Sequence, residues 1–172
     1  MSPEACERKI AVTQYDIVKS LFLADRAHLN KYGRPITFDN YVAMEHGPVP
    51  STAYNFLKED ARALRKYGDV LPWSRTKTPD LGKSCFRYWA PKRAPNEDVL
   101  SPSDSDELRS ALTIVKALGF AQIRRLTHED QAYLDAWEGH DGRRQYPMSY
   151  ALLFDEPAEG KAEELAFISK HI

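Results

Sequence analysis

Two pairs that combine a carboxylate with a histidine are the residues of this chain that could do chemistry. Asp25 and His28 stand one turn apart on a predicted helix, and Glu45 directly precedes His46. A carboxylate beside an imidazole can perform general acid–base catalysis. We favour a structural role, in which Asp25 accepts hydrogen bonds from backbone near the following corner and His28 caps the inner face of the helix. A hydrolase built on Asp25, His28 and His46 is a weaker alternative.

A further cluster of two histidines and two carboxylates could be assembled into a metal site: His128, Glu129, His140 and Asp141. Its spacing matches neither an HExxH motif nor a zinc ribbon, and we expect His128 to orient the start of a helix. The chain has no GxSxG motif, no Walker loop and no dinucleotide fingerprint. We therefore expect no catalytic residues, no metal and no cofactor, and we do not expect an enzyme.

A long amphipathic helix, predicted over 14–31, positions the first of these pairs. Thr13 and Asp16 form an S/T-x-x-D capping pattern that serves the free N–H groups of the first turn. Apolar residues then recur at helical spacing on one broad face: Ile17, Val18, Leu21, Phe22, Ala24 and Leu29. Gly33 is the expected left-handed terminator, and Pro35 prevents the helix from continuing.

A stiff GPVP segment, Gly47 to Pro50, follows the corner. Pro48 and Pro50 fix their own backbone angles and push the residues before them out of helical space, so Val49 is held extended. Gly47 has no side chain to obstruct a close neighbour. The segment is either a rigid lead-in to a helix, which we favour, or a recognition loop whose prolines reduce the entropy lost on binding. Residues 41–44 before it suit a short strand or an irregular apolar segment.

The remaining elements follow from the same signals. A helix over 51–66 places Lys58, Arg62 and Arg65 on one stripe, which is either a solvated face or a contact for an acidic partner. Antiparallel pairing is expected across 70–92, with turn chemistry at 79–82. Three further helices are predicted: 104–118, closed by Gly119; 128–138, capped by Thr127; and 159–170. Between the first two, Phe120, Ile123 and Leu126 suit a short helix. Together these elements predict one domain over 1–172, α+β and mostly α, a compact helical domain with a small antiparallel β-hairpin.

Composition excludes several classes of protein. The 172 residues are 42% hydrophobic and 28% charged, as in ordinary soluble domains. A net charge of −1 argues against a dedicated nucleic-acid binder. The N-terminal segment lacks the apolar region of a signal peptide, and no apolar run approaches the ~20 residues that span a bilayer. Cys6 and Cys85 are far apart and show no ligand spacing, so we expect idle thiols in the cytoplasm.

Several motifs of this chain closely resemble the SocA-like antitoxin domain, also called Panacea or GepA-like. The first is K-x-L-F-L-A-D-R, at Lys19 and Leu21 to Arg26, followed by Y-G-R-P-I-T at Tyr32 to Thr37. Y-V-A-M and G-P-V-P then follow at Tyr41 to Met44 and Gly47 to Pro50. Leu126-Thr127-His128 with the later Trp137 is similar to the family's downstream block. The resemblance covers most of the chain, but the hairpin region and roughly the last thirty residues match only in type.

The resemblance implies an antitoxin that binds and blocks a co-encoded toxin in a prokaryotic, phage-associated setting. Family members are paired with unrelated toxins, and at least one type delivers its toxin to a protease. The motif residues that we expect to be structural are Asp25, Gly33, Pro35, Gly47, Pro48, Pro50, His128 and Trp137. Since aromatic and arginine side chains dominate interface energy, we expect toxin contacts around the corner and the GPVP segment. The candidates are Arg34, Tyr41, His46, Pro48, Arg62 and Arg65.

The rival hypothesis is a winged-helix-like DNA-binding regulator. The order helix, extended segment, helix and hairpin resembles that of a winged helix, and the hairpin carries basic residues: Arg75, Lys77 and Lys83. Asp80 interrupts them, and no neighbouring helix is densely basic. We therefore expect a protein toxin as partner, with a protease as a second partner in the adaptor case, and neither nucleic acid nor a membrane.

Overall fold

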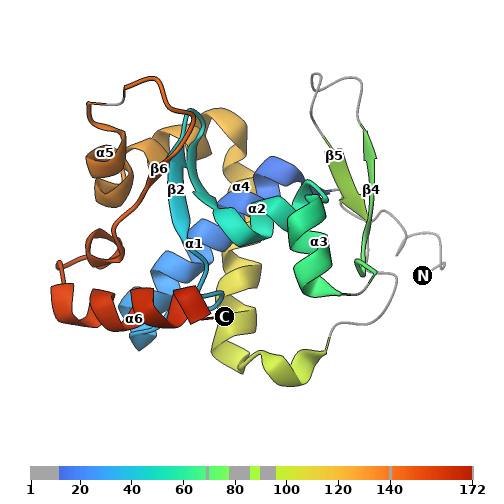
Figure 1. The fold of residues 1–172 in the computed structure, drawn as a ribbon, viewed down its shortest axis with the longest axis horizontal. Coiled ribbons are helices and arrows are strands. Elements are labelled where there is room, and N and C mark those ends of the chain that lie inside the picture. The colour runs from blue at the N-terminus through green and yellow to red at the C-terminus, as the bar shows by residue number, and fades with distance from the viewer. Residues whose placement is uncertain (1–11, 69, 78–85, 90–95, 140, 172) are drawn as a thin grey trace.

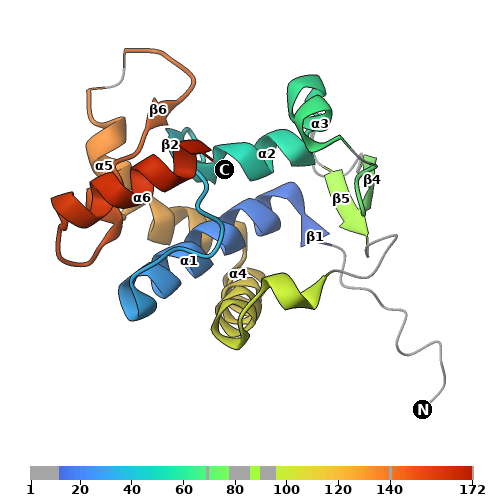
Figure 2. The same ribbon diagram turned by 60° about the horizontal axis from the view of Figure 1, so that its bottom comes forward.

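The first helix, α1 (Gln14–Tyr32), is the element against which much of the chain packs (Figure 1, Figure 2). The predicted capping box is confirmed: the Thr13 hydroxyl accepts from Asp16 N at 3.1 Å, and the Asp16 carboxylate accepts from Thr13 N at 2.9 Å. Gly33 ends the helix in the left-handed conformation, with φ 80°. The long helix α4 (Pro102–His128) packs along α1.

The computed structural model describes residues 12–68, 70–77, 86–89, 96–139 and 141–171. Over these residues the protein is α+β and mostly α, with six α-helices and two small antiparallel sheets, so the predicted fold class is confirmed. In Figure 1, α5 (Gln131–Trp137) and α6 (Glu159–His171) lie towards one end, and the strands β4 (Ser74–Lys77) and β5 (Phe86–Trp89) lie towards the other. None of the helices in the described segments is both long and apolar enough to cross a bilayer.

The corner after α1 leads into a hairpin that the sequence only partly predicted. β2 (Tyr41–Met44) pairs with β3 (Gly47–Pro50), and Met44 lies opposite Gly47. β6 (Tyr146–Pro147) joins the free side of β2, so the strand order is β3-β2-β6. Residues 41–44 are thus a strand, and Val49 is extended as predicted. The two prolines lie on an edge strand, where a missing N–H breaks no ladder bond.

The single helix predicted over 51–66 is wrong. The structure has two helices there: α2 (Ser51–Leu57) and α3 (Ala61–Tyr67). The Asp60 side chain accepts from the first free backbone N–H groups of α3, at 2.9 and 3.2 Å, and Glu59 before it has φ 58°. An aspartate that caps a new helix competes with continuation of the old one. The break separates Lys58 from Arg62, so the predicted continuous basic stripe does not form.

The predicted hairpin within 70–92 is confirmed in its described part and gains a third strand. β4 (Ser74–Lys77) pairs antiparallel with β5 (Phe86–Trp89), and the short β1 (Val12–Thr13) pairs with the other side of β5. The predicted turn at 79–82, Lys83 and both cysteines lie outside the described residues. The hairpin is therefore joined to the start of α1 as well as to the loop after α3.

Helix α4 combines two predicted helices, and the start of α5 differs from the prediction. Gly119, with φ 70° and ψ 179°, interrupts α4 as predicted, and the short helix predicted around Phe120, Ile123 and Leu126 follows it. Thr127 does not cap the next helix: it is buried in the last turn of α4, and its hydroxyl donates to the Ile123 carbonyl at 2.9 Å. Asp130 caps α5 instead, accepting from Ala132 N at 3.0 Å. The helix predicted over 128–138 thus begins three residues later.

Two apolar clusters hold these elements together. The larger one joins α1, β2, α5 and α6 with the 3₁₀ turn η4 (Tyr150–Leu153), around Phe22, Tyr41 and Tyr133. The smaller one joins α1 to β3, α2 and β5 around Val18 and Tyr88. A further 3₁₀ turn, η3 (Glu97–Val99), precedes α4. Helix α6 forms close to its predicted limits of 159–170, and it covers the larger cluster.

Candidate functional site

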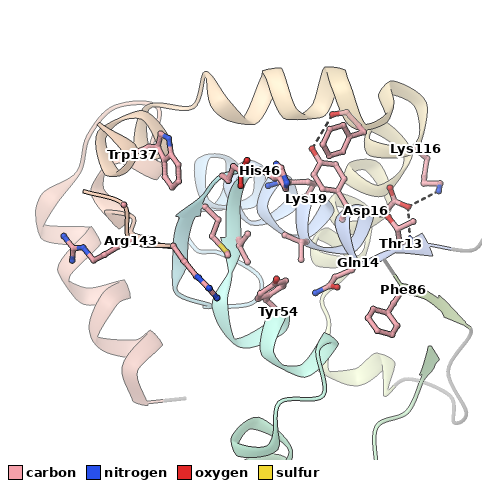
Figure 3. A pocket seen from close by; sticks show the side chains of 18 residues that line it. Thr13, Gln14, Asp16, Lys19, His46, Tyr54, Phe86, Lys116, Trp137 and Arg143 are labelled. Atoms are coloured by element: carbon pink, nitrogen blue, oxygen red, sulfur yellow. Dashed lines mark hydrogen bonds and ion pairs between the residues drawn. The ribbon is translucent and has the colours of Figure 1, made fainter. Parts of the chain in front are cut away.

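A groove opens between the start of α1, the tip of the β2–β3 hairpin and the middle of α4 (Figure 3). It has a volume of about 1250 Å³. We call it the groove, and its lining residues are Thr13 to Asp16, Val18, Lys19, Met44 to His46, Val49, Tyr54, Phe86, Lys116, Phe120, Trp137 and Gly142 to Arg144. In Figure 3 Trp137 and Arg143 lie at one end and Lys116 and Phe86 at the other.

The capped end of α1 forms one wall of the groove. The capping box fixes Thr13 and Asp16 at the first turn, so Tyr15 projects from a rigid segment. The Asp16 carboxylate also accepts from Lys116 Nζ at 3.0 Å, which joins α1 to α4 across the groove's rim. Asp16 is therefore already engaged from two directions, and much of its negative charge is compensated.

The interruption of α4 at Gly119 places Phe120 beside this end of α1. Its positive φ favours glycine, and the residue after it, Phe120, is 53% exposed. The Phe120 ring lies 4.7 Å from the Tyr15 ring and 6.0 Å from the His46 ring, measured between centroids. These three rings form an aromatic wall that is open to solvent on one side. We call Tyr15, His46 and Phe120 the aromatic wall.

Lys19 lies beneath this wall and is almost completely buried, with 1% of its surface exposed. Its Nζ donates to the Pro48 carbonyl at 2.8 Å and lies 5.4 Å from the centre of the Tyr15 ring. Burial lowers the pKa of this ammonium group from 10.5 to about 7, because the charged form loses hydration. Lys19 therefore ties β3 to α1 and titrates near neutral pH.

Gly47 lies where three side chains converge on the hairpin. A Cβ atom at this position would be 2.8 Å from Lys19 Nζ, 2.8 Å from Thr127 Oγ1 and 3.3 Å from His128 Cδ2. The His128 ring stacks on Tyr133 with 4.5 Å between centroids. Burial, followed by nearby cationic side chains, lowers the pKa of His128. This close packing holds the tip of the hairpin against α1 and α4.

We expect the substitution Lys19→Met to change how stability depends on pH. The unfolded chain keeps the Lys19 proton up to about pH 10.5, whereas the folded chain releases it near pH 7. Between these values the unfolded state binds more protons, so stability rises with pH. Relative to Lys19→Met, the natural protein should gain about 2 kcal/mol of unfolding free energy between about pH 7 and pH 9. Denaturant melts at both pH values measure this gain.

The matched control is Lys31→Met, which removes an exposed lysine from the same helix. It should leave the dependence on pH between those two values as it is in the natural protein. Parallel curves for the natural protein and Lys19→Met would contradict a titration of Lys19 in this range.

Behind the groove, Asp25 organises the corner that follows α1. Its carboxylate accepts from Ile36 N at 2.8 Å and from Thr37 N at 2.9 Å, as predicted. It also accepts from the hydroxyl of Thr37 and, at 2.7 Å, from the hydroxyl of Tyr41. Burial raises the pKa of Asp25, and these hydrogen bonds oppose that rise. One carboxylate thus fixes the chain between α1 and β2.

His28 and Arg34 dock the same corner on the start of α4. His28 Nδ1 donates to the Arg34 carbonyl at 2.8 Å, and Nε2 lies 3.1 Å from Asp104 Oδ1. The Arg34 guanidinium donates to the Asp104 carboxylate at 2.8 Å. Asp104 belongs to the capping box of α4 with Ser101. His28 therefore joins two helices, which is a structural use of its side chain.

A comparison with known families adds an independent observation. The sequence profile described as Antitoxin SocA-like, Panacea domain, matches residues 17–133, about two thirds of the chain. The chain belongs to the SocA-like (Panacea) antitoxin family. The match includes Lys19, the β2–β3 hairpin and Phe120, but not Trp137 or the loop at 142–144. No curated protein and no solved structure matched the chain significantly.

Most of the family-motif residues lie in the corner and the hairpin of this Panacea domain. Three prolines are fully buried: Pro35, Pro48 and Pro50. His128 lies in the last turn of α4 rather than at the start of α5, so the expectation that it orients a helix start is wrong. It stacks on Tyr133, which in turn stacks on Trp137 with 5.8 Å between centroids. The downstream block thus packs against the hairpin, whose Met44 carbonyl accepts from the Tyr133 hydroxyl at 3.0 Å.

Two of the predicted toxin contacts are not exposed. Tyr41 has 3% of its surface exposed, because its ring packs against Phe22 and its hydroxyl binds Asp25. Pro48 is fully buried between its neighbours, and its carbonyl accepts from Lys19. The expectation that these two residues are surface anchors is therefore wrong. Both side chains pack in the protein interior instead.

The other predicted contacts lie on three separate surfaces. His46 is exposed at the tip of the hairpin and lines the groove. Arg34 is half-exposed and paired with Asp104 at the far end of α1. Arg62 and Arg65 are exposed on α3, outside the groove. Only His46 therefore belongs to the groove, and a role in toxin binding remains a prediction for all four residues.

The residues of the hydrolase hypothesis do not share a pocket. Asp25 and His28 are buried and occupied by backbone and side-chain partners of the corner, whereas His46 is exposed beside Phe120. Among the described residues, no group of three or more His, Cys, Asp or Glu side chains is placed to hold a metal ion. His140, part of the suggested cluster, lies outside those residues. The arrangement lacks the contacts that the acid–base hypothesis requires.

Several groove residues were missed as functional candidates: Tyr15, Lys19, Lys116, Phe120, Arg143 and Arg144. Two signals could have pointed to them. Lys19 is a lysine within the apolar pattern of α1, and a buried lysine at such a position needs a partner. Gly119 followed by Phe120 places a large apolar side chain directly after a helix interruption. The remaining residues carry no such signal.

Proposed function

We propose that this protein is an antitoxin that neutralises a co-encoded toxin by binding it directly. Membership of the SocA-like (Panacea) family carries the proposal. The groove supports it, because it is preformed on rigid elements and lined by aromatic and cationic side chains, which are common anchors of protein interfaces. Asp25 and His28 also support it, since their hydrogen bonds hold the fold together. The protein therefore acts by binding rather than by catalysis.

The proposal places the protein and its toxin in the cytoplasm. Neutralisation can proceed by blocking the toxin alone or by delivering the bound toxin to a protease, as the family resemblance implies. Following the half-life of the toxin in cells with and without this protein distinguishes the two routes.

The test is to express the small gene encoded beside this one, alone and together with it. We expect growth arrest that this protein relieves, and co-purification of the two proteins. The folded variants Asp25→Asn and His28→Gln should each still relieve the arrest, because a binding protein has no catalytic side chain whose loss lowers activity by orders of magnitude. The proposal fails if no neighbouring product is toxic. It also fails if either variant is folded and binds the toxin normally but no longer relieves the arrest.

The DNA-binding alternative receives less support from the geometry. Arg75, one of the basic hairpin residues, stacks over Phe86 at 4.2 Å. It also donates to the Leu57 carbonyl at 2.8 Å and pairs with Glu59 at 2.8 Å. These intramolecular contacts therefore occupy the Arg75 guanidinium. Steep salt dependence of binding to duplex DNA would favour the alternative.

A further inference from the structure

A second pocket lies beside the smaller apolar cluster, where α1 and α2 meet the sheet β1-β5-β4. In Figure 2, α2 and β5 both lie near the start of α1. We call it the apolar pocket, and it shares no lining residue with the groove. Its lining combines apolar side chains of α1 and α2, among them Leu21, Ala53 and Phe56, with three aromatic residues: Trp73, Tyr88 and Trp89.

The apolar pocket has the volume of a small-molecule site. It measures about 360 Å³, and sites for small molecules and cofactors enclose about 300–1,000 Å³. Every described side chain that lines it is aliphatic or aromatic, and none of these carries a charge. A charged molecule would lose its hydration there without finding a partner. The pocket therefore favours an apolar ligand.

Three of the lining side chains carry a polar atom, and two of these atoms are already hydrogen-bonded. The Tyr88 hydroxyl donates to the Leu57 carbonyl at 2.6 Å, and Trp89 Nε1 donates to the Thr76 hydroxyl at 2.9 Å. Trp73 Nε1 is buried and has no hydrogen-bond partner in the described part of the chain. The lining of the apolar pocket thus includes one unsatisfied donor, the indole N–H of Trp73.

This single donor narrows the chemistry of the occupant. A buried donor without a partner costs free energy, so a ligand that accepts from Trp73 gains more than the burial of its apolar surface. Water fits poorly, because a buried water needs about two to four polar partners. A carbonyl group on an apolar molecule accepts the one hydrogen bond, and the rest of the molecule is buried against aliphatic and aromatic walls.

We propose that the apolar pocket binds a small apolar molecule with a single carbonyl group, and that the indole N–H of Trp73 donates to this carbonyl. The inference is independent of the antitoxin function and of the groove. Because the pocket joins α1 and α2 to the sheet, an occupant stabilises the folded chain. An aliphatic side chain of a protein partner would also fit the walls, but it carries no acceptor for Trp73.

The first experiment titrates the full chain with Prodan, a fluorescent naphthalene ketone whose emission moves to shorter wavelength in apolar surroundings. Prodan should bind with a Kd of about 200 µM or lower and show this shift. Ala53→Leu enlarges a side chain that lines the pocket and should weaken binding at least about tenfold. Ala117→Leu is the matched control, because Ala117 is exposed on α4 and lines neither the groove nor the apolar pocket.

The control should stay within about twofold of the natural protein. Phe120→Ala, which alters the groove, should also leave the affinity for Prodan as it is. Absence of binding would overturn the inference. Binding that Ala53→Leu leaves intact, or that Phe120→Ala removes, would overturn it as well, because the probe would then occupy another site.

The second experiment tests the donor. Acetylnaphthalene and isopropylnaphthalene have nearly the same shape, but only the first has a carbonyl group. Each is titrated as a competitor of Prodan against the natural protein and against Trp73→Phe, which keeps an aromatic ring without the N–H. Trp73→Phe should weaken the binding of acetylnaphthalene about three- to tenfold and leave isopropylnaphthalene within about twofold. Equal changes for the two compounds would overturn the inference.

The third experiment separates a small molecule from a side chain of the toxin as occupant. Saturating acetylnaphthalene should raise the melting temperature of the natural protein but not that of Ala53→Leu. Toxin bound to the protein should leave Prodan in place. Displacement of Prodan by the toxin would assign the pocket to the protein interface and overturn the inference. If no neighbouring gene product is toxic, the antitoxin proposal fails, while the Prodan titrations still decide this one.

Discussion

Gly47→Val should destabilise the protein by about 3–5 kcal/mol, because two penalties add at one position. The backbone of Gly47 has φ +96°, which strains any residue with a β-carbon. The added side chain would also press against Lys19 Nζ and Thr127 Oγ1, each 2.8 Å from its Cβ position. Both neighbours are buried and hydrogen-bonded, so neither can move away cheaply. Thermal or denaturant unfolding measures the loss, which is a large part of a typical domain's stability.

The structure offers a matched control for the backbone penalty. Gly68 has φ +72° at the end of α3, and no atom lies within 4 Å of its Cβ position. Gly68→Val should therefore cost about 1–3 kcal/mol, the strain alone. Equal losses at the two positions would mean that the close contacts of Gly47 contribute nothing. A Gly47→Val variant that melts like the natural protein would contradict the observed geometry of the hairpin.

Asp25→Ala is the second substitution with a large expected effect, a loss of about 3–5 kcal/mol. The carboxylate accepts four hydrogen bonds: from the backbone N–H groups of Ile36 and Thr37 and from the hydroxyls of Thr37 and Tyr41. Asp25 is 2% exposed, so water cannot readily replace the lost acceptor, and buried unsatisfied donors are expensive. The corner between α1 and β2 should loosen. Hydrogen exchange at Ile36 and Thr37 would report this directly, beside the unfolding free energy.

Asp60→Ala is the matched control, because Asp60 also accepts from two backbone N–H groups but at the surface. Water can take its place there, so the loss should be about 1 kcal/mol, as for other helix caps. Asp25→Asn keeps an acceptor oxygen and should lose less than Asp25→Ala. If Asp25→Ala costs no more than Asp60→Ala, burial is not what makes the Asp25 carboxylate important.

Local signals let the sequence determine the positions of several elements. The limits of α1 follow from Thr13, Asp16 and Gly33, whose capping and left-handed conformation depend on a few neighbouring residues. The interruption at Gly119 and the extended Val49 between two prolines are local in the same sense. The motifs were also sufficient to indicate the antitoxin family.

Two local signals compete at the positions where the predicted helix limits are wrong. Asp60 divides a helix that was predicted to be continuous, and Thr127 does not form the helix cap that was predicted for it. Asp60 lies inside an apolar pattern of helical period, yet its capping bonds divide α2 from α3. Thr127 and Asp130 could each cap the helix that follows, and burial of Thr127 beside Gly47 leaves that role to Asp130. Periodicity alone does not rank such signals, because the ranking depends on which side chain is buried.

The tertiary structure alone decided which residues are exposed and which of them meet. Tyrosine is a common anchor of protein interfaces. The hydroxyl of Tyr41 nevertheless binds Asp25, sixteen positions earlier, and this contact holds the side chain in the protein interior. The groove unites Tyr15, His46, Phe120 and Arg144, which come from four separate segments. Their spacing in the chain carries no period that could reveal the contact. The groove exists because α4 packs along α1 and the β2–β3 hairpin packs against both helices, an arrangement set by long-range burial rather than by local propensity.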